Sequence, residues 1–312
     1  MDGRTVNGPT QYGPELAGAY AECRAIARRE AKNFYYAFVA LPAARRNAIC
    51  AIYAFMRQAD DLADDESLSH EERRTRLDVW LAEWHGVCLG GNASNRVFLA
   101  VRDATQRFAI PPGLLDELVD GVTMDLKPEA GDAPDTYATF ADVYRYCYLV
   151  ASVVGLVCIR IFGYKDSRAE KLAEETGIAF QLTNILRDVA EDAARNRVYL
   201  PLEDLAAYGI RLDSLLHRAE GAPPTVAERA LLKEIAGRAE KFYESAQGLM
   251  PLIDRESRPA LWVLVSIYEG LLKRIERANY DVFSRRASVP MAEKLGILAV
   301  GLARMGWARL FG

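Results

Sequence analysis

The sequence predicts an all-α fold in a single domain, with helices packed around a central apolar cavity. Apolar residues recur at helical spacing along most of the chain, and no segment shows the alternation typical of a half-buried strand. Glycine, proline and capping residues separate long helical segments, and no linker divides the 312 residues. A composition of 51% hydrophobic and 26% charged residues is that of a globular protein with a sizeable core.

The first half of the chain is expected to form five helices after a tail. Residues 1–14 contain three glycines and no long apolar run, which indicates a flexible tail and not a signal peptide. Ser69 and Glu72 have the spacing of a capping box at the start of the third helix. The predicted helices are 15–32, 42–65, 69–89, 94–108 and 111–126. Residues 127–138, rich in Pro, Gly and Asp, are predicted to be a loop.

The second half opens with the most apolar predicted helix, 140–162. Its charge-free stretch of 11 residues is too short to span a bilayer, so a buried helix is expected. Small Ala151, Ser152 and Gly155 leave room on one face, which can form a cavity wall while the other face meets the core. Further helices are predicted to begin near 166, at 226–250 and 258–281, and over 291–312.

Charge and cysteine content exclude several classes of function. A net charge of −4 argues against nonspecific nucleic-acid binding. Five scattered cysteines without a CxxC motif indicate reduced thiols in a cytoplasmic protein, not disulfides or a zinc site. The three histidines lie far apart and lack metal-ligand spacing.

In each of two predicted helices, several polar residues lie along one face and form a polar stripe. In the first, Tyr53, Arg57, Asp60 and Asp64 share a face at about 100° per residue, with Asp61 beside them. In the second, the stripe consists of Gln181, Asn184, Asp188 and Asp192, with Arg187 and Glu191 adjacent.

The chemistry of these stripes predicts metal and diphosphate binding. A solvated acidic face usually carries lysines one turn away, and neither segment contains a Lys. Carboxylates one turn apart repel each other unless a cation neutralises them. Two such faces across a cavity would hold Mg2+, with Mn2+ as an alternative, and these ions would bind a diphosphate.

The motifs resemble those of the squalene and phytoene synthases. The segments that match this family are 33–38 (NFYYAF), 51–64 (AIYAFMRQADDLAD), 146–148 with Gly155, 181–192 (QLTNILRDVAED), 195–201 (RNRVYLP), and Tyr268 with 278–280 and Arg285. The resemblance covers roughly residues 20–300. The chain departs from the family at Asn33, where a serine is common, while Lys32 is retained.

This resemblance implies a role for each matching residue. The catalytic residues would be Tyr53, Arg57, Tyr146 and Arg187. The substrate-binding residues would be Lys32, Phe34, Val150, Gly155, Gln181, Asn184, Tyr268 and Arg285. The metal ligands would be Asp60, Asp61, Asp64, Asp188, Glu191 and Asp192. The implied fold is an isoprenoid-synthase-type helical bundle, with 15–290 as the catalytic domain.

The implied activity is the Mg2+-dependent head-to-head (1'-1) condensation of two prenyl diphosphates. Segments 34–38 and 161–163 are most similar to bacterial squalene-pathway members, which favours farnesyl diphosphate and presqualene diphosphate, with squalene as a later product. The alternative is phytoene synthesis from geranylgeranyl diphosphate. A chain elongase or terpene cyclase fits residues 181–201 poorly, and a noncatalytic scaffold would have lost the carboxylates. NADPH would be needed only for a reductive second step, and downstream isoprenoid enzymes are candidate partners.

The C-terminal segment 291–312 has two interpretations. Its apolar run, 295–302, is followed by Arg304, Trp307, Arg309 and Phe311. One interpretation is a closing core helix of the same domain. The other is an amphipathic helix at the cytoplasmic face of a membrane, with its arginines on anionic lipid, beside the exit of a water-insoluble product.

Overall fold

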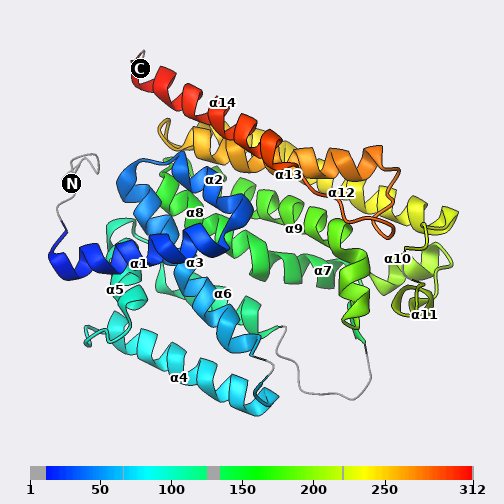
Figure 1. The fold of residues 1–312 in the computed structure, drawn as a ribbon, viewed down its shortest axis with the longest axis horizontal. Coiled ribbons are helices and arrows are strands. Elements are labelled where there is room, and N and C mark those ends of the chain that lie inside the picture. The colour runs from blue at the N-terminus through cyan, green and yellow to red at the C-terminus, as the bar shows by residue number, and fades with distance from the viewer. Residues whose placement is uncertain (1–11, 66, 125–133, 220, 311–312) are drawn as a thin grey trace.

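A computed structural model of the chain describes residues 12–65, 67–124, 134–219 and 221–310. It confirms the all-α fold (Figure 1). In the first half the helices are α1 (Pro14–Glu30), α2 (Lys32–Val39), α3 (Ala43–Ala63), α4 (His70–Cys88), α5 (Arg96–Arg107), α6 (Pro112–Thr123) and α7 (Phe140–Cys147). A π-helical turn, η1 (Tyr148–Ser152), joins α7 to α8 (Val153–Phe162). The second half contains α9 (Arg168–Ala194), α10 (Leu202–Ala207), α11 (Leu212–Leu216), α12 (Val226–Leu249), the 3-10 turn η2 (Met250–Leu252), α13 (Arg258–Arg277) and α14 (Met291–Leu310).

Helices α3, α8 and α9 form the middle of the bundle (Figure 1). Helix α9 packs against α12, η1 and α8, while α3 packs against α1 and α5. Helix α4 lies along one edge, and α13 and α14 lie along the opposite edge (Figure 1). The only strands among the described residues, β1 (Asp135–Thr136) and β2 (Arg197–Val198), form one short parallel pair. The core is therefore built from helix faces.

Capping residues explain where several helices begin. The capping box predicted at Ser69 and Glu72 is present, and Thr139 and Thr225 form the same arrangement at α7 and α12. In each box the hydroxyl accepts a backbone N–H that the helix leaves unpaired, and an acidic side chain accepts another. Pro42 precedes α3 as its N-cap, so the helix starts one residue later than predicted.

Two interruptions were not predicted. The segment expected as one helix to residue 32 ends at Glu30, and a separate helix, α2, follows. The expected continuous helix 140–162 contains the π turn η1, which is held against α9. A Cβ on Gly177 of α9 would lie 2.6 Å from the Cα of Ser152, so only glycine permits this approach. Ser152 Oγ also donates to the Glu174 carbonyl at 2.6 Å.

One helical run within the described ranges, Phe140–Phe162, has the length and composition of a membrane span. Of its most apolar window, 44% is buried inside the protein. Its contacts with α9 and α6 are those of a core helix.

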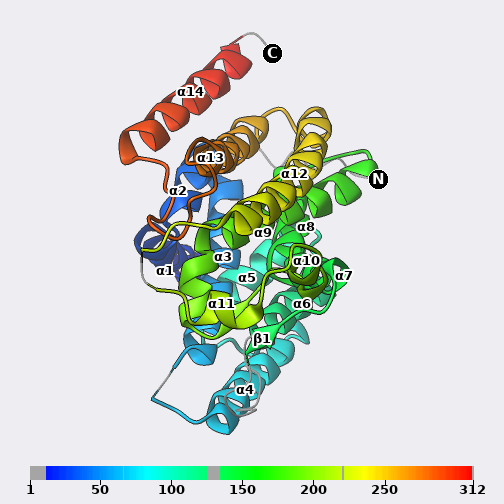
Figure 2. The ribbon, with the colours of Figure 1, turned by 90° about the vertical axis from the view of Figure 1, so that its right-hand side faces the viewer.

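The last helix, α14, lies on the outside of the bundle, where it packs against α13 and α2 (Figures 1 and 2). Its inner face includes Gly301, which is buried against Val263. Its outer face exposes Met291, Leu295 and Val300, each close to half or more. The side chains predicted to enter a membrane, Trp307 and Phe311, lie outside the described residues, as do the Arg309 side chain and most of the predicted tail 1–14.

Candidate active site

A cavity of about 660 Å³ lies between α3, η1–α8, α9 and α13. The end of α1, Phe38 of α2 and the segment before α14 complete its wall. Its volume is within the range of about 300–1,000 Å³ typical of small-molecule sites. The predicted central cavity is therefore present.

The cavity changes from apolar to polar along its length. On α3, Ile49 and Ile52 line it before Asp60 does. On α9, Ala173, Thr176 and Gly177 come first, and the amide and charged lining residues follow in the order Gln181, Asn184, Arg187. Both helices therefore bring polar side chains to the cavity near their C-terminal ends. The geometry suits a ligand with a charged head and an apolar chain.

Both acidic stripes lie where a helix tolerates negative charge least. Asp60 is in the last turn of α3, and Asp64 is its C-cap. Asp188, Glu191 and Asp192 are in the last two turns of α9. The C-terminal end of a helix carries partial negative charge, so carboxylates there need a cation nearby. Neither helix has a basic residue in its last turn.

Arginines supply part of that positive charge. Arg57 pairs with Asp61 one turn later on α3. Arg187 Nε donates to Asp188 Oδ1 at 2.7 Å. Arg286, from the segment between α13 and α14, donates to the same oxygen through Nε and Nη2 at 2.9 and 2.8 Å. Burial alone would raise the pKa of Asp188, but the two guanidiniums lower it below its usual value.

Asn184 and Tyr268 form the polar edge of the cavity wall. Asn184 Nδ2 donates to Gln181 Oε1 at 3.1 Å, while the buried Asn184 Oδ1 has no hydrogen-bond partner. The Tyr268 ring stacks on Phe180 with a centroid separation of 4.4 Å. Burial raises the pKa of Tyr268, although Arg187 and a hydrogen bond with Asn184 act in the opposite direction. Tyr268 therefore stays a neutral phenol beside the cavity.

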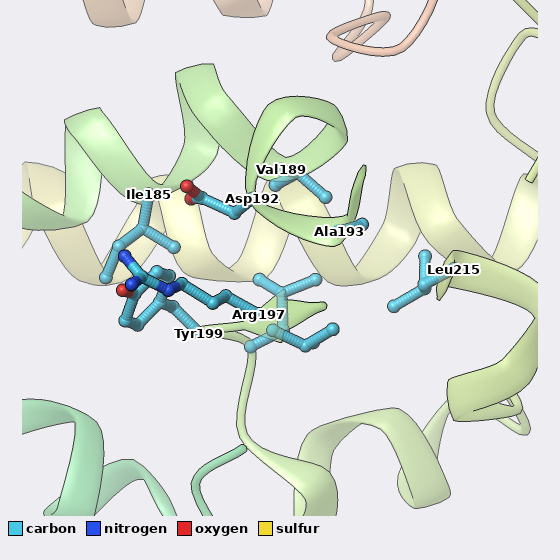
Figure 3. A pocket seen from close by; sticks show the side chains of 9 residues that line it. Ile185, Val189, Asp192, Ala193, Arg197, Tyr199 and Leu215 are labelled. Atoms are coloured by element: carbon cyan, nitrogen blue, oxygen red, sulfur yellow. The ribbon is translucent and has the colours of Figure 1, made fainter. Parts of the chain in front are cut away.

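Asp192 lies apart from the large cavity, over a small pocket of about 10 Å³ (Figure 3). The figure shows Asp192 on α9 on one side of this pocket, with Arg197 and Tyr199 on the other. Burial, helped by the charge of Asp188, raises the pKa of Asp192 to about 7. Tyr199 stacks on Tyr146 at 4.7 Å. Tyr146 is thus part of an aromatic stack beneath α9.

Comparison with known proteins agrees with this architecture. The family model described as squalene/phytoene synthase matches residues 27–293. The chain belongs to this family. A 15-cis-phytoene synthase from Synechococcus elongatus is 33% identical over 308 residues, which cover 95% of this chain and 96% of that protein. A phytoene synthase from Mycobacterium tuberculosis is 34% identical, over 93% and 92% of the two chains.

Solved structures show the same fold. A dehydrosqualene synthase in complex with a ligand superposes with a TM-score of 0.81, at 27% identity over 94% of this chain and 98% of that one. Squalene synthase HpnC from Alicyclobacillus acidocaldarius gives a TM-score of 0.77, at 26% identity over 86% and 97%. The squalene/phytoene synthases are head-to-head prenyltransferases of the isoprenoid-synthase fold, and this chain is an enzyme of that type.

The structure brings many of the residues implied by the family resemblance to one cavity. Those that line it are Tyr53, Asp60, Val150, Gly155, Gln181, Asn184, Arg187 and Tyr268. The residues beyond its lining are Arg57, Asp61, Asp64, Tyr146, Asp188, Glu191, Asp192 and Arg285. Asp188 and Glu191 nevertheless contact Arg286, which does line it. The side chains of Lys32 and Phe34, in α2, lie outside the described residues.

Three charged lining residues were not predicted: Glu30, Arg286 and Lys294. Arg285, which the resemblance suggested, is exposed, and its neighbour Arg286 faces the cavity instead. Burial lowers the pKa of Lys294, and the nearby charge of Arg187 adds to this effect. No periodic pattern marks these residues, because they lie at a helix end, in a loop and near a helix start.

The residues present fit Mg2+ bound together with a diphosphate. Within the described ranges, no three His, Cys, Asp or Glu side chains already form a cluster able to hold an ion. Mg2+ commonly takes only one or two protein oxygens and completes its shell with water and phosphate. The orphaned Asn184 Oδ1 and the Asp60 carboxylate, on opposite helices of one cavity, are oxygen donors of the required kind.

Proposed function

We propose that this enzyme joins two farnesyl diphosphates head to head (1'-1) to form presqualene diphosphate, in a reaction that requires Mg2+ or, as a substitute, Mn2+. The observation that carries the proposal is the single cavity whose polar end contains Asp60, Asn184 and Arg187 and whose remainder is apolar. Such a cavity can hold diphosphates at one end and prenyl chains in the rest, away from water.

The size of the cavity favours the shorter substrate. Its 660 Å³ is typical of a site for one drug-sized ligand, yet it must hold two prenyl chains. Two farnesyl chains are easier to accommodate than two geranylgeranyl chains. The structural similarity to a dehydrosqualene synthase points the same way. Phytoene synthesis from geranylgeranyl diphosphate is the second candidate, which the sequence similarity to phytoene synthases favours.

The proposed reaction begins when one farnesyl diphosphate loses its diphosphate. Carbon 1 of the resulting allylic cation bonds to the C2–C3 double bond of the second molecule. Loss of one proton then closes a cyclopropane, so the products are presqualene diphosphate, free diphosphate and a proton. Either the departing diphosphate or a tyrosine can accept that proton.

The side chains at the polar end assist the departure of the diphosphate. Asp60, Asn184 and Asp188 would hold Mg2+, which supplies charge neutralisation for the leaving group. Arg187 and Lys294 face the same end and can donate hydrogen bonds to diphosphate oxygens. Further along, the faces of Tyr53 and Phe180 can stabilise the cation while the apolar wall excludes water.

Product analysis tests the proposal. The purified enzyme would be given farnesyl or geranylgeranyl diphosphate with Mg2+, with and without NADPH, and its products separated by chromatography. We expect presqualene diphosphate from farnesyl diphosphate without NADPH. Formation of squalene when NADPH is present would show that the enzyme also catalyses the reductive second step. Phytoene from geranylgeranyl diphosphate, without a farnesyl product, would replace the farnesyl proposal by its alternative, and no condensation product at all would contradict both.

We also propose that α14 rests on the cytoplasmic face of a membrane. Beside the charged Glu293 and Arg304, its exposed residues form an apolar stripe that consists of Met291, Ala292, Leu295, Gly296, Ala299, Val300 and Ala303. Arg304 lies 4.0 Å from the centroid of the Trp262 ring, a pairing suited to a lipid headgroup region. Val289 and Lys294, which line the cavity, flank the start of the helix. A water-insoluble product leaving there would enter the bilayer directly.

A further inference from the structure

The segment 278–290, which joins α13 to α14, places one arginine on the acidic end of α9. Arg286 donates twice to Asp188 Oδ1, at 2.9 and 2.8 Å, and its Nε lies 3.2 Å from Glu191 Oε1. Its side chain is 51% exposed, and it also lines the cavity. One guanidinium therefore connects Asp188 of the second polar stripe with the adjacent Glu191 on the solvent side.

The backbone on both sides of Arg286 is anchored. Phe283 and Val289 are buried, and the guanidinium of Arg218 covers the Phe283 ring at 3.8 Å. Ser284 Oγ donates to the Gly221 carbonyl at 3.2 Å. Because these contacts hold the main chain, Arg286 can leave the carboxylates by rotation of its own side chain.

The two arginines that bind Asp188, Arg187 and Arg286, differ in how firmly they are held. Arg187 precedes Asp188 on the same helix, and its side chain is only 18% exposed. Its place on the same helix and its burial keep it beside Asp188. Arg286 comes from another segment and is open to solvent, so it is the partner that can be exchanged.

We propose that Arg286 is an internal counter-ion that competes with Mg2+ for Asp188 and Glu191 and must be displaced when the metal binds. This inference rests on the proposed Mg2+ dependence. Asp188 Oδ1 accepts two hydrogen bonds from Arg286 and cannot also bind Mg2+ at about 2.1 Å while that guanidinium stays in place. Without the metal, Arg286 offsets the repulsion between carboxylates at the C-terminal end of α9. Its displacement therefore lowers the metal affinity of the site.

A Mg2+ titration of the full chain tests this competition without turnover. The melting temperature would be followed against Mg2+ concentration, first alone and then with a fixed concentration of inorganic pyrophosphate. Arg286→Gln should lower the half-saturating Mg2+ concentration by about two- to fivefold, the range expected for a half-exposed ion pair. Arg277→Gln removes the same charge from the exposed end of α13 and should leave it unchanged.

Arg286→Lys is a second variant, which keeps the positive charge but loses the planar guanidinium group. Its half-saturating Mg2+ concentration should lie between those of the wild type and Arg286→Gln. Unchanged or weaker Mg2+ binding by Arg286→Gln would overturn the proposal. Weaker binding seen only with pyrophosphate would also overturn it, because Arg286 would then be a diphosphate ligand. If the wild type itself showed no response to Mg2+ and pyrophosphate, the proposed metal dependence would be wrong, and the competition with it.

Discussion

Gly177→Ala should destabilise the enzyme through the contact between α9 and the π turn. The added Cβ would lie 2.6 Å from Ser152 Cα, 2.8 Å from its N and 2.9 Å from its Oγ. Ordinary contact begins at 3.4 Å, so the two backbones must separate by about 0.8 Å at this point. That movement stretches the hydrogen bond from Ser152 Oγ to the Glu174 carbonyl, whose present length is 2.6 Å.

The magnitude follows from three contributions. Overpacking costs about 1–3 kcal/mol, and the weakened hydrogen bond adds about 1 kcal/mol. Alanine is a better helix former than glycine, and this difference stabilises the folded state by up to about 1 kcal/mol. The net loss of about 2 kcal/mol corresponds to a fall of roughly 3 °C in melting temperature for a chain of 312 residues. Turnover should fall as well, because Val150 and Ala151 of the π turn line the cavity.

Thermal unfolding followed by circular dichroism provides the measurement, and Gly237→Ala provides the control. Gly237 is also inside a helix, α12, but an added Cβ there would meet no atom within 4 Å. The control variant should therefore melt at or slightly above the temperature of the wild type. A Gly177→Ala protein that melts like the control would show that the close approach of α9 and η1 imposes no constraint.

Three further predictions concern the metal site, pH and the membrane. Asp60→Asn should abolish turnover with little change in melting temperature. Asp188→Asn should abolish turnover and also lower the melting temperature, because the side chain at position 188 loses its ion pairs with two guanidinium groups. Full activity in either variant would contradict the metal assignment. Burial would raise the pKa of Glu228, but hydrogen bonds from Arg218 and Thr225 lower it below 4.5. Glu228→Gln should therefore lower the free energy of unfolding by about 2 kcal/mol at neutral pH, and this difference, measured by urea unfolding, should shrink as the pH falls below about 4.5. A difference in unfolding free energy that does not depend on pH would contradict this prediction. The full chain should sediment with anionic vesicles at low salt, and a smaller fraction of the Leu295→Glu variant should sediment with them. Equal sedimentation of the two proteins would place the membrane contact elsewhere than on the exposed face of α14.

The long helices could be predicted because their signals are local. Ser69 and Glu72 are three residues apart, and the hydroxyl and carboxylate of such a pair satisfy the first N–H groups of the helix in any context. The faces of α3 and α9 followed from spacing alone, which is why Asp60, Gln181 and Asn184 reach the same cavity as expected. These features depend on residues within a few turns of each other.

The features that escaped prediction depend on contacts between distant segments. The π turn at Ser152 exists beside Gly177, and no short-range pattern signals that approach. Arg286 faces the cavity while Arg285 does not, because the path of segment 278–290 is set by the burial of Phe283 and Val289. Tyr146 matched a family position, yet its surroundings, a stack with Tyr199 beneath α9, could not be deduced from neighbouring residues.

The packing of α2 against α13 and α14 has a consequence for biosynthesis. One wall of the cavity comes from residues 30–60, and the opposite wall, around Tyr268, comes near the end of the chain. While the ribosome is still making the last helices, the faces of α2 and α9 that pack against α13 have no partner to cover them. Such a nascent chain is a substrate for chaperones and prone to aggregation, and its folding has to wait for contacts across more than two hundred residues. Expression yield should therefore respond strongly to chaperone supply and to any early stop codon before α13.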